Sequence, residues 1–284
     1  MSYLEYKNYY FIGIGGIGMS AMAEYMLSIN KNIAGYDREE SFSTNRLESL
    51  GIKIINKDNP DYINLKFKEN KKTLVVFTPA ISSSNSILKY FKKNKFKIIK
   101  RSDLLAEVVN SKFCIAIAGT HGKTTTTSIL SHILFNSKLK FTSFIGGIIR
   151  GYESNIILNG NKIFLVEADE YDKTFLKIKP NIASIINIDG DHYDIYSNIY
   201  DLKKSFKKFT KNLKEGGILF HDSTLDFNGF SFGFDSNSNA QIINLTHTNG
   251  KTIFDIRINE DVFKNVELNM PGIHNATNAL VAFL

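Results

Sequence analysis

Cysteine is almost absent from this sequence. Cys114 is the only one among 284 residues, so no disulfide bond can form within the chain. It stands in the apolar run 113–118, where it is either a buried structural thiol or a reactive one, and its apolar neighbours favour the structural role. A chain without disulfides suits a reducing compartment, and we expect a cytoplasmic location.

Long apolar segments are absent as well. No stretch approaches the ~18 consecutive apolar residues of a helix that spans a membrane. The first residues, MSYLEYKNYYF, have no basic start, apolar core or small-residue cleavage site, so they do not resemble a signal peptide. We therefore expect no association with a membrane.

Acidic residues are the minority among the charged side chains. The chain has 28 Asp and Glu against 35 Lys and Arg, and its net charge of +7 raises the question of nucleic-acid binding. Residues 199–214 are rich in lysine, but apolar residues recur among the lysines at helical spacing: Leu202, Phe206, Phe209 and Leu213. This pattern is typical of a helix with one buried and one solvated face. We expect no nucleic-acid partner.

Apolar runs alternate with helical patterns along the chain, which indicates an α/β fold. The runs that we predict as strands are 9–14, 32–36, 73–77, 112–118, 163–166, 183–188 and 217–220. Strands that alternate with helices favour a parallel sheet with crossover helices. The pattern restarts near residue 108, so we predict two domains, 1–107 and 108–284. Residues 274–284 predict a helix with no capping residue at its end, and we expect a following domain to be missing.

A glycine-rich sequence, GIGGIG at 13–18, stands between the first predicted strand and a helical pattern. Glycines permit a tight turn and the close approach of a diphosphate, and the helix N-terminus supplies N–H donors. Asp37 ends the second predicted strand, where an acid commonly holds ribose hydroxyls. We predict a Rossmann-like nucleotide-binding domain over residues 1–107. A purely structural turn is the alternative, and the pattern does not separate NAD from a UDP-sugar.

A second glycine loop, AGTHGKTT at 118–125, is a shorter form of the phosphate-binding loop GxxxxGK[ST], because isoleucine stands at position 117. In such a loop backbone N–H groups cradle phosphates, Lys123 neutralises β- and γ-phosphate charge, and the Thr124 hydroxyl can bind Mg²⁺. A strand before the loop and an apolar helix after it supply the expected context. We predict a P-loop ATP-binding domain with a mostly parallel sheet over 108–284, with a polar turn as the alternative.

Acidic side chains gather after two further predicted strands. FLVEADEYD at 164–172 places four carboxylates within six residues, and NIDGDHYD at 187–194 flanks His192 with two aspartates. Carboxylates held together repel one another, and a divalent cation relieves that repulsion. In a P-loop protein the acid at such a strand end holds Mg²⁺. The alternatives are a solvated acidic loop and a structural histidine.

Together these motifs resemble those of the Mur ligases. GIGGIGMS at 13–20, AGTHGKTTTT at 118–127, EADEYDKTFL at 167–176, NIDGDHYDIY at 187–196 and PGIHNATNAL at 271–280 occur in the family's order and at similar spacing. The resemblance covers essentially the whole chain but only two of the family's three domains. We therefore expect a fragment or a truncated gene product, with little ligase activity of its own.

The resemblance implies an ATP-dependent amide ligase of peptidoglycan precursor synthesis. ATP would phosphorylate the lactyl carboxylate of UDP-N-acetylmuramate, and the amine of an amino acid would attack the acyl phosphate. GIGGIGMS, DKTFL and DGDHYDIY favour the branch of the family that adds L-alanine. EADEYD is similar to the branch that attaches a whole tripeptide, which remains an alternative.

The resemblance also implies roles for individual residues. The positions that match the family's ATP site are Gly119, Thr120, His121, Gly122, Lys123, Thr124, Thr125, His274, Asn275 and Asn278. The positions that match its UDP-sugar site are Gly15, Gly16, Ile17, Gly18, Met19, Ser20 and Asp37. Thr124, Glu167 and His192 would hold Mg²⁺, and Lys123, Glu167 and His192 would carry the chemistry. No position matches the carbamylated lysine that other Mur ligases use.

Two hypotheses from other classes stay open. An NAD-dependent oxidoreductase would explain GIGGIG, but it gives the phosphate loop and the acidic strand ends no role. A non-catalytic nucleotide-binding remnant would keep the same motifs, so the sequence does not exclude it. Neither the amino-acid specificity nor the oligomeric state can be predicted from these residues.

Overall fold

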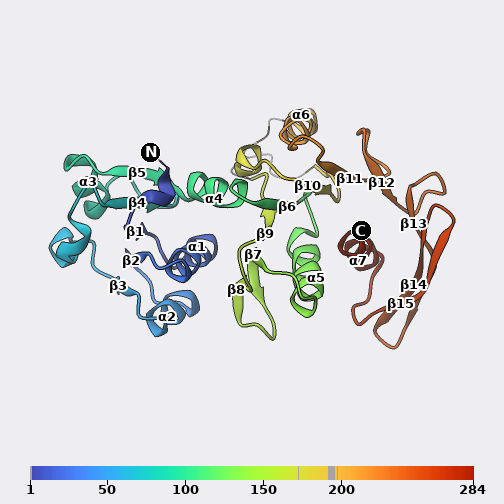
Figure 1. Ribbon diagram of the computed structural model, residues 1–284, viewed down its shortest axis with the longest axis horizontal. Helices are drawn as coiled ribbons and strands as arrows, with labels where there is room; N and C mark the ends of the chain where they lie inside the picture. Colours follow the sequence, from blue (N-terminus) through green and yellow to red (C-terminus); the bar gives the residue numbers. More distant parts are fainter. Residues whose placement is uncertain (1, 172, 191–195, 197) are drawn as a thin grey trace. The chain divides into compact units, whose positions relative to one another are not determined.

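The computed structural model describes residues 2–171, 173–190, 196 and 198–284. The chain forms two compact units, each built around its own sheet (Figure 1). Unit 1 comprises residues 1–111 and 146–158, and unit 2 comprises residues 112–145 and 159–284. The assignment of domain functions to 1–107 and 108–284 stays a prediction.

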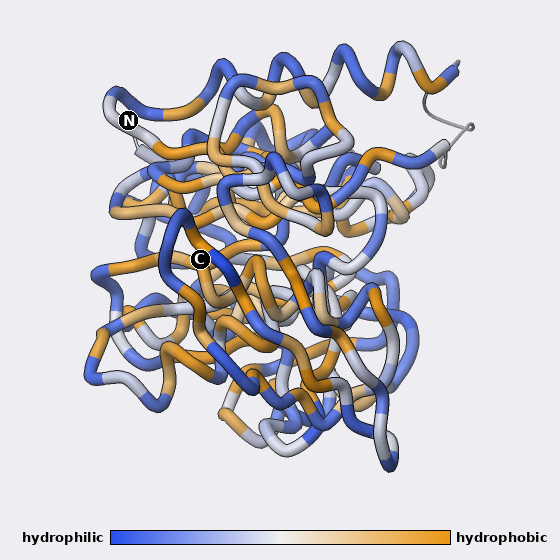
Figure 2. Tube along the Cα trace, turned by 90° about the vertical axis from the view of Figure 1, so that its right-hand side faces the viewer, coloured by the Kyte–Doolittle hydropathy of each residue, from blue (hydrophilic) through white to orange (hydrophobic). Residues whose placement is uncertain are grey.

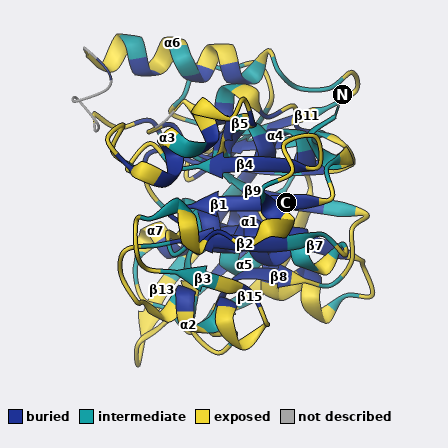
Figure 3. Ribbon diagram, turned by 90° about the vertical axis from the view of Figure 1, so that its left-hand side faces the viewer, coloured by how far each residue is buried: buried dark blue, intermediate teal, exposed yellow. Residues whose placement is uncertain are grey.

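Unit 1 contains a five-stranded parallel sheet in the order β3-β2-β1-β4-β5. Its strands are β1 (Asn8–Ile12), β2 (Asn32–Tyr36), β3 (Lys53–Ile55), β4 (Thr73–Phe77) and β5 (Lys97–Lys100). Its helices are α1 (Ile17–Ser28), α2 (Phe42–Ser49), α3 (Ser86–Lys93) and α4 (Arg101–Asn110). All five residues of β1 are buried, as Figure 3 shows for the centre of this sheet. Helices cover both faces of such a sheet, so its central strands are continuous apolar runs.

An aromatic cluster fills one side of this core. The ring centroid of Tyr10 lies 5.0 Å from that of Phe91, which in turn lies 4.8 Å from that of Phe96. Tyr10, on β1, and Phe91, on α3, are almost fully buried. This packing fixes α3 against the sheet and so shapes the loops that follow its strands.

Unit 2 is built on a longer sheet in the order β15-β14-β13-β12-β11-β10-β6-β9-β7-β8, whose last strand belongs to the second segment of unit 1. Its central strands are β6 (Phe113–Ala118), β9 (Ile163–Ala168), β10 (Ile182–Ile185), β11 (Ile218–Asp222) and β12 (Phe230–Gly233), and they run parallel. The remaining strands are β7 (Phe141–Ile149), β8 (Ser154–Leu158), β13 (Ala240–Thr248), β14 (Lys251–Ile258) and β15 (Asp261–Leu268). The helices α5 (Lys123–Asn136) and α7 (Ile273–Phe283) lie on one face and α6 (Ile199–Thr210) on the other (Figure 1).

The α/β fold and the mostly parallel central sheets agree with the sequence prediction, and some boundaries differ. The strand predicted over 183–188 ends at Ile185, because the residues after it leave the sheet and bond to a neighbouring loop. The helix predicted over 199–214 ends at Thr210. Along α6, at the top of Figure 2, hydrophilic and hydrophobic positions alternate, and Leu202, Phe206 and Phe209 are its buried residues.

The antiparallel ribbon β13–β15 and the β7–β8 hairpin were not predicted. A signal for the ribbon was present, because Asn249-Gly250 joins β13 to β14 with φ of 51° and 77°. Asn-Gly with positive φ at both positions is the favoured two-residue hairpin turn. None of the helices in the described part of the chain is long and apolar enough to cross a membrane.

The single cysteine lies in the middle of unit 2. Cys114 is on β6 and has no exposed surface. Burial raises the pKa of its thiol to about 12. Since the thiolate is the reactive form, Cys114 is a structural residue.

Candidate functional site

The phosphate loop joins the end of β6 to the start of α5. Gly119 and Gly122 adopt φ of 145° and 83°, in the region that favours glycine. A side chain at Gly122 would collide with the amide oxygen of Asn278 on α7. The glycines are therefore required by both backbone conformation and space, and the loop places Lys123 at the first position of α5.

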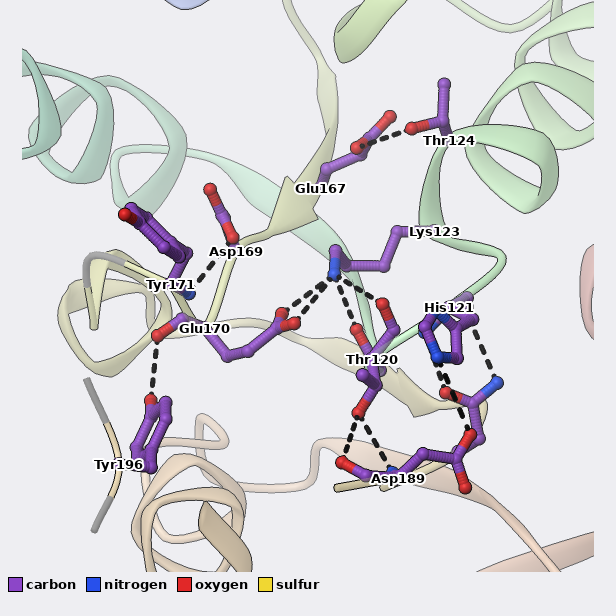
Figure 4. A network of polar contacts seen from close by, with 12 residues as sticks. Thr120, His121, Lys123, Thr124, Glu167, Asp169, Glu170, Tyr171, Asp189 and Tyr196 are labelled. Carbon is purple, nitrogen blue, oxygen red and sulfur yellow. Dashed lines mark hydrogen bonds and ion pairs between the residues drawn. The ribbon is translucent and has the colours of Figure 1, made fainter. Parts of the chain in front are cut away.

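Lys123 makes an ion pair with a buried carboxylate that sequence reasoning missed. Its ammonium lies 2.8 and 3.0 Å from the two carboxylate oxygens of Glu170, whose side chain has no exposed surface (Figure 4). Lys123 also donates to the backbone oxygens of Gly119, at 2.6 Å, and Thr120, at 3.2 Å. A buried ion pair is favourable only when its geometry is good, and here both carboxylate oxygens are used. These contacts fix the position of the Lys123 ammonium next to the glycines of the loop.

Tyr196 fastens the segment that carries Glu170. Its hydroxyl donates to the backbone oxygen of Glu170 at 2.7 Å (Figure 4). Burial is the main cause that raises the pKa of Tyr196 to about 12, so the hydroxyl keeps its proton and acts as a donor. The carboxylate of Glu170 therefore faces Lys123 from a fixed backbone.

Thr124, in the first turn of α5, contacts Glu167, near the end of β9. β9 pairs with β6 in parallel, with Glu167 opposite Ile117, so Glu167 lies beside the start of the loop. The Thr124 hydroxyl donates to the Glu167 carboxylate at 3.1 Å. Hydroxyl and carboxylate oxygens are the ligands that Mg²⁺ prefers, so this pair fits a magnesium site. His192 lies outside the described residues, as do Asp172, Asp191 and Asp194.

A metal site made only of acidic, histidine or cysteine side chains is not present in the described part of the chain. No three His, Cys, Asp or Glu residues cluster there in a way that could hold an ion. Of the three predicted magnesium ligands, the structure gives the positions of two, Thr124 and Glu167, because His192 lies outside the described residues.

A second loop, after β10, lies against the phosphate loop. Asn187 accepts from the backbone N–H of His121 through its side chain at 2.8 Å and donates to the His121 oxygen at 3.1 Å. The backbone N–H of Asp189 donates to the Thr120 hydroxyl at 3.0 Å. The Asp189 carboxylate lies 4.0 Å from the His121 ring (Figure 4). Sequence reasoning assigned Asn187 no role.

Helix α7 brings one of the predicted C-terminal residues, Asn278, to the same loop. The Thr126 hydroxyl donates to the side-chain oxygen of Asn278 at 3.2 Å, and both residues are buried. Asn275 is also buried and donates to the oxygen of Pro271 at 2.7 Å. The His274 ring lies against Gly272. Asn278 therefore supports the phosphate loop, and the predicted contacts of His274, Asn275 and Asn278 with a nucleotide stay predictions.

The glycine turn of unit 1 is built differently. Gly13 adopts a φ of 84°, and Gly15 donates its backbone N–H to the carboxylate of Asp37 at 2.7 Å. A side chain at Gly15 would come within 2.9 Å of that carboxylate, and one at Gly18 within 2.8 Å of the Arg101 guanidinium. The predicted residues divide by exposure: Gly16 and Ile17 reach solvent, and the side chains of Met19 and Ser20 are buried.

A cavity of about 450 Å³ lies at the carboxyl ends of the strands of unit 1. Asp37 and Arg38 follow β2 on one side of it, Asp58 lies on another side, and Ser82 and Ser84 follow β4. Polar groups at this edge of a parallel sheet are typical of a nucleotide site. Of these residues, sequence reasoning identified only Asp37, and the serine run after β4 was the signal that could have extended the site.

Two glycine loops, each between a buried parallel strand and a helix, place the chain in the class of α/β proteins that combine a Rossmann-like turn with a P-loop-type loop. Comparison with known proteins identifies which. The chain belongs to the Mur ligase family: its residues 8–113 match the model of the family's catalytic domain, and residues 117–284 match that of the middle domain.

Similar proteins include two curated ligases. The chain is 44% identical to the UDP-N-acetylmuramate–L-alanine ligase of Flavobacterium psychrophilum over 99% of its length and 63% of the relative's. It is 42% identical to the ligase of that name from Christiangramia forsetii, over 97% of its length and 61% of the relative's. The chain thus spans about three fifths of the length of these relatives.

Solved structures agree with this fold. A UDP-N-acetylmuramate-alanine ligase from Thermotoga maritima is 27% identical with a TM-score of 0.85, and the match covers 97% of this chain and 64% of that one. A UDP-N-acetylmuramate:L-alanyl-gamma-D-glutamyl-meso-diaminopimelate ligase from Neisseria meningitides has the same TM-score of 0.85 at 22% identity, covering 98% of this chain and 92% of that one. At that identity the second match speaks for the fold alone.

Proposed function

We propose that this chain binds ATP and UDP-N-acetylmuramate for an enzyme that ligates L-alanine to the sugar nucleotide. The observation that carries the proposal is the phosphate loop, in which Lys123 stands beside Glu170 and the Thr124–Glu167 pair lies at the next strand end. The L-alanine branch is supported by the names of the most similar curated relatives. Because the chain spans 61–63% of their length, the complete reaction is proposed for the whole protein.

In the proposed reaction the lactyl carboxylate attacks the γ-phosphate of ATP, and the bond from that phosphorus to the β,γ-bridging oxygen breaks. Negative charge shifts toward the departing ADP, so a fixed cation at the loop stabilises the transition state. Lys123 supplies this cation. The backbone N–H groups in the first turn of α5 have no partners inside the helix and point toward the same phosphates.

The amine of L-alanine then attacks the carbonyl carbon of the acyl phosphate. The carbon–oxygen bond to phosphate breaks, the amine loses a proton, and an amide and inorganic phosphate result. Holding the two reactants at ~3–3.5 Å can supply ~7–11 kcal/mol of the barrier. The groups that hold the amine are not among the residues we assign.

Thr124 and Glu167 are the residues that would hold Mg²⁺, with His192 as a third, and the ion would supply charge neutralisation at the transferring phosphate. The support for this proposal is the 3.1 Å contact between the Thr124 hydroxyl and the Glu167 carboxylate. Both are oxygen donors, as a hard cation requires. We propose that Glu167 orients Thr124, and that Lys123 and Glu167 are catalytic residues.

In unit 1 the turn over residues 13–20 and the adjacent cavity would bind the UDP part. Gly16 and Ile17 are the exposed residues at the start of α1, where a helix N-terminus attracts a diphosphate. Asp37 and Arg38 border the cavity of about 450 Å³, with the hydroxyls of Ser82 and Ser84 opposite. These groups can accept from ribose hydroxyls and bond to the edge of a uracil ring. A cytoplasmic location follows from these substrates.

Two binding experiments test the proposal on residues 1–284. Calorimetry should show separate binding of Mg·ATP and of UDP-N-acetylmuramate, and no binding of NADH. With both ligands present, hydroxylamine should trap the acyl phosphate as a hydroxamate that mass spectrometry detects. Binding of NADH in place of UDP-N-acetylmuramate would favour an oxidoreductase, and binding of both proposed ligands without hydroxamate would favour a non-catalytic remnant.

An experiment on the whole protein distinguishes specificity for L-alanine from the alternative specificity for a tripeptide. Mass spectrometry of the product formed with L-alanine and with the tripeptide, each offered alone, distinguishes them. We expect product only with L-alanine, and product only with the tripeptide would contradict the assignment.

A further inference from the structure

We propose that Asn187 is the positioning residue of the phosphate loop: its side-chain amide fixes the two peptide planes on either side of His121. This inference deepens the proposed function and rests on it, because the loop is assumed to bind the phosphates of ATP. Asn187 belongs to neither the loop nor the set of residues assigned above to substrate or metal.

The ladder between β6 and β10 ends just before the phosphate loop. These strands pair in parallel up to Ala118 and Ile185. Beyond them the N–H of Thr120 still donates to the backbone oxygen of Asn187, at 3.2 Å. The chain therefore reaches the loop with Asn187 beside it.

The side-chain amide of Asn187 and the backbone of His121 match in their hydrogen-bond donors and acceptors. The amide oxygen of Asn187 accepts from the His121 N–H at 2.8 Å, and its amide nitrogen donates to the His121 oxygen at 3.1 Å. Donor and acceptor of one planar group thus face acceptor and donor of one residue, as in a strand pair. The N–H of His121 belongs to the peptide before it and its oxygen to the peptide after it, so both planes are fixed.

The two peptide planes determine how the chain enters α5. The peptide after His121 leads into Gly122, whose φ is 83°, and then into the first turn of α5. The N–H groups of that turn are the ones that bind phosphates in a P-loop. Fixing a backbone residue costs conformational entropy, and a glycine loop has the most to lose. A loop ordered in advance by Asn187 does not lose this on binding ATP.

The same strand offers a matched control at its other end. Asn181 precedes β10, and its side-chain oxygen accepts from the N–H of Cys114 at 2.9 Å. It also accepts from Lys214 at 3.2 Å. Asn181 therefore bridges the chain around β10 to β6 as Asn187 does, but at the end of β6 that is remote from the loop.

The test compares Asn187→Leu with Asn181→Leu. Each variant loses two side-chain hydrogen bonds, Asn187→Leu those to His121 and Asn181→Leu those to Cys114 and Lys214, so both should lower the unfolding midpoint. Asn187→Leu should also weaken Mg·ATP binding about tenfold to hundredfold, because only a fraction of the molecules then have an ordered loop. Asn181→Leu should stay within about twofold of wild type, and UDP-N-acetylmuramate binding should be unchanged in both.

Hydrogen exchange supplies a second measurement that does not depend on nucleotide. In Asn187→Leu, amide exchange should accelerate in the peptide covering residues 119–125, and in Asn181→Leu it should not. If Asn187→Leu does not fold, Asn187→Ser decides, since serine is smaller and cannot span both atoms of His121.

The outcomes separate the two proposals. If the wild type binds Mg·ATP and Asn187→Leu binds it within about twofold, or Asn181→Leu loses as much, the positioning role is wrong. If the wild type does not bind Mg·ATP, the proposed function fails, and the exchange data alone then decide whether Asn187 orders the loop: unchanged exchange over residues 119–125 in Asn187→Leu would overturn that role as well.

Discussion

The two glycine loops of this protein have the same plan and differ in the charged groups that contact them. In unit 1 a backbone N–H of the turn, that of Gly15, already donates to a carboxylate, Asp37, and no lysine stands in the turn. In unit 2 the loop carries Lys123, and its charge is balanced by a buried carboxylate, Glu170. A strand, glycines and a helix thus make a site for phosphates in general. In the proposed function, the charged residues next to the glycines decide whether the loop only holds a diphosphate or also helps to transfer a phosphoryl group.

The largest effect should follow from removing the lysine. Lys123→Met should weaken Mg·ATP binding by about 1.5–3 kcal/mol, as for a hydrogen bond to a charged group. It should also destabilise the fold by about 3–5 kcal/mol, because Glu170 loses the ammonium that neutralises it. Calorimetry and chemical unfolding measure the two effects separately.

A double variant sharpens this result. Lys123→Met combined with Glu170→Gln should recover most of the stability, since no buried charge remains, and should recover none of the ATP affinity. UDP-N-acetylmuramate binding should be unchanged throughout. If the double variant is as unstable as the single one, the uncompensated charge of Glu170 is not the cause of the stability lost in Lys123→Met.

Alanine at the glycines should separate the two loops. Gly122→Ala adds a side chain at a φ of 83° and against Asn278, so it should cost more than the ~1–2 kcal/mol of a left-handed alanine and impair ATP binding. Gly15→Ala crowds Asp37 and should impair only UDP-N-acetylmuramate binding. Gly51→Ala is the control, because its φ is 85° but nothing lies within 4 Å. Equal losses of both ligands in one variant would contradict separate sites.

A smaller effect is expected from the proposed magnesium site. Glu167→Gln keeps the size of the side chain and removes its charge, so the Mg²⁺ concentration needed for half-maximal ATP binding should rise roughly tenfold. Circular dichroism should remain that of the wild type. An unchanged dependence on Mg²⁺ would exclude Glu167 as a ligand.

The smallest effect lies away from both loops. Asp255 accepts from the side chain of Asn244 and from the backbone N–H of Asn265, each at 2.8 Å, and these bonds lower its pKa below 3.8. The folded state therefore binds this proton less readily than the unfolded state. The stabilisation is present above the unfolded pKa and is lost as pH falls through the folded one.

Asp255→Asn should therefore reduce the loss of stability between about pH 5 and pH 2, the range over which such a group titrates. Chemical unfolding at several pH values in that range measures the difference. Neither ligand affinity should change at neutral pH. An identical acid dependence in wild type and variant would show that Asp255 contributes nothing to it.

Much of the fold could be predicted because parallel strands buried on both faces are plain apolar runs. β2 and β4 begin and end where the sequence places them, and β6 differs by one residue. The ribbon β13–β15 was missed because charged and polar residues interrupt its apolar positions, so neither period stands out. Its turn, Asn249-Gly250, is a local signal that a closer search would have found.

The site could be predicted only as far as its motifs are local in sequence. Four carboxylates lie within six residues at the end of β9, and no periodicity tells which of them faces Lys123, because the chain leaves the strand after Ala168. Glu170 takes that place and Glu167 contacts Thr124. The bond of Asn187 to His121 joins residues 66 positions apart, and only the pairing of β6 with β10 brings them together.

Because the single cysteine is buried, its reaction with a thiol reagent can report local opening of the protein. Cys114 lies in the strand that leads into the phosphate loop, and its protonated, enclosed thiol cannot react while β6 stays in the sheet. The rate at which a thiol reagent modifies the native chain therefore counts how often the centre of unit 2 opens. A ligand that binds at the loop should slow this reaction, and one that binds only in unit 1 should not. A cysteine introduced at an exposed position should be labelled much faster than Cys114, so the native thiol need not be removed first.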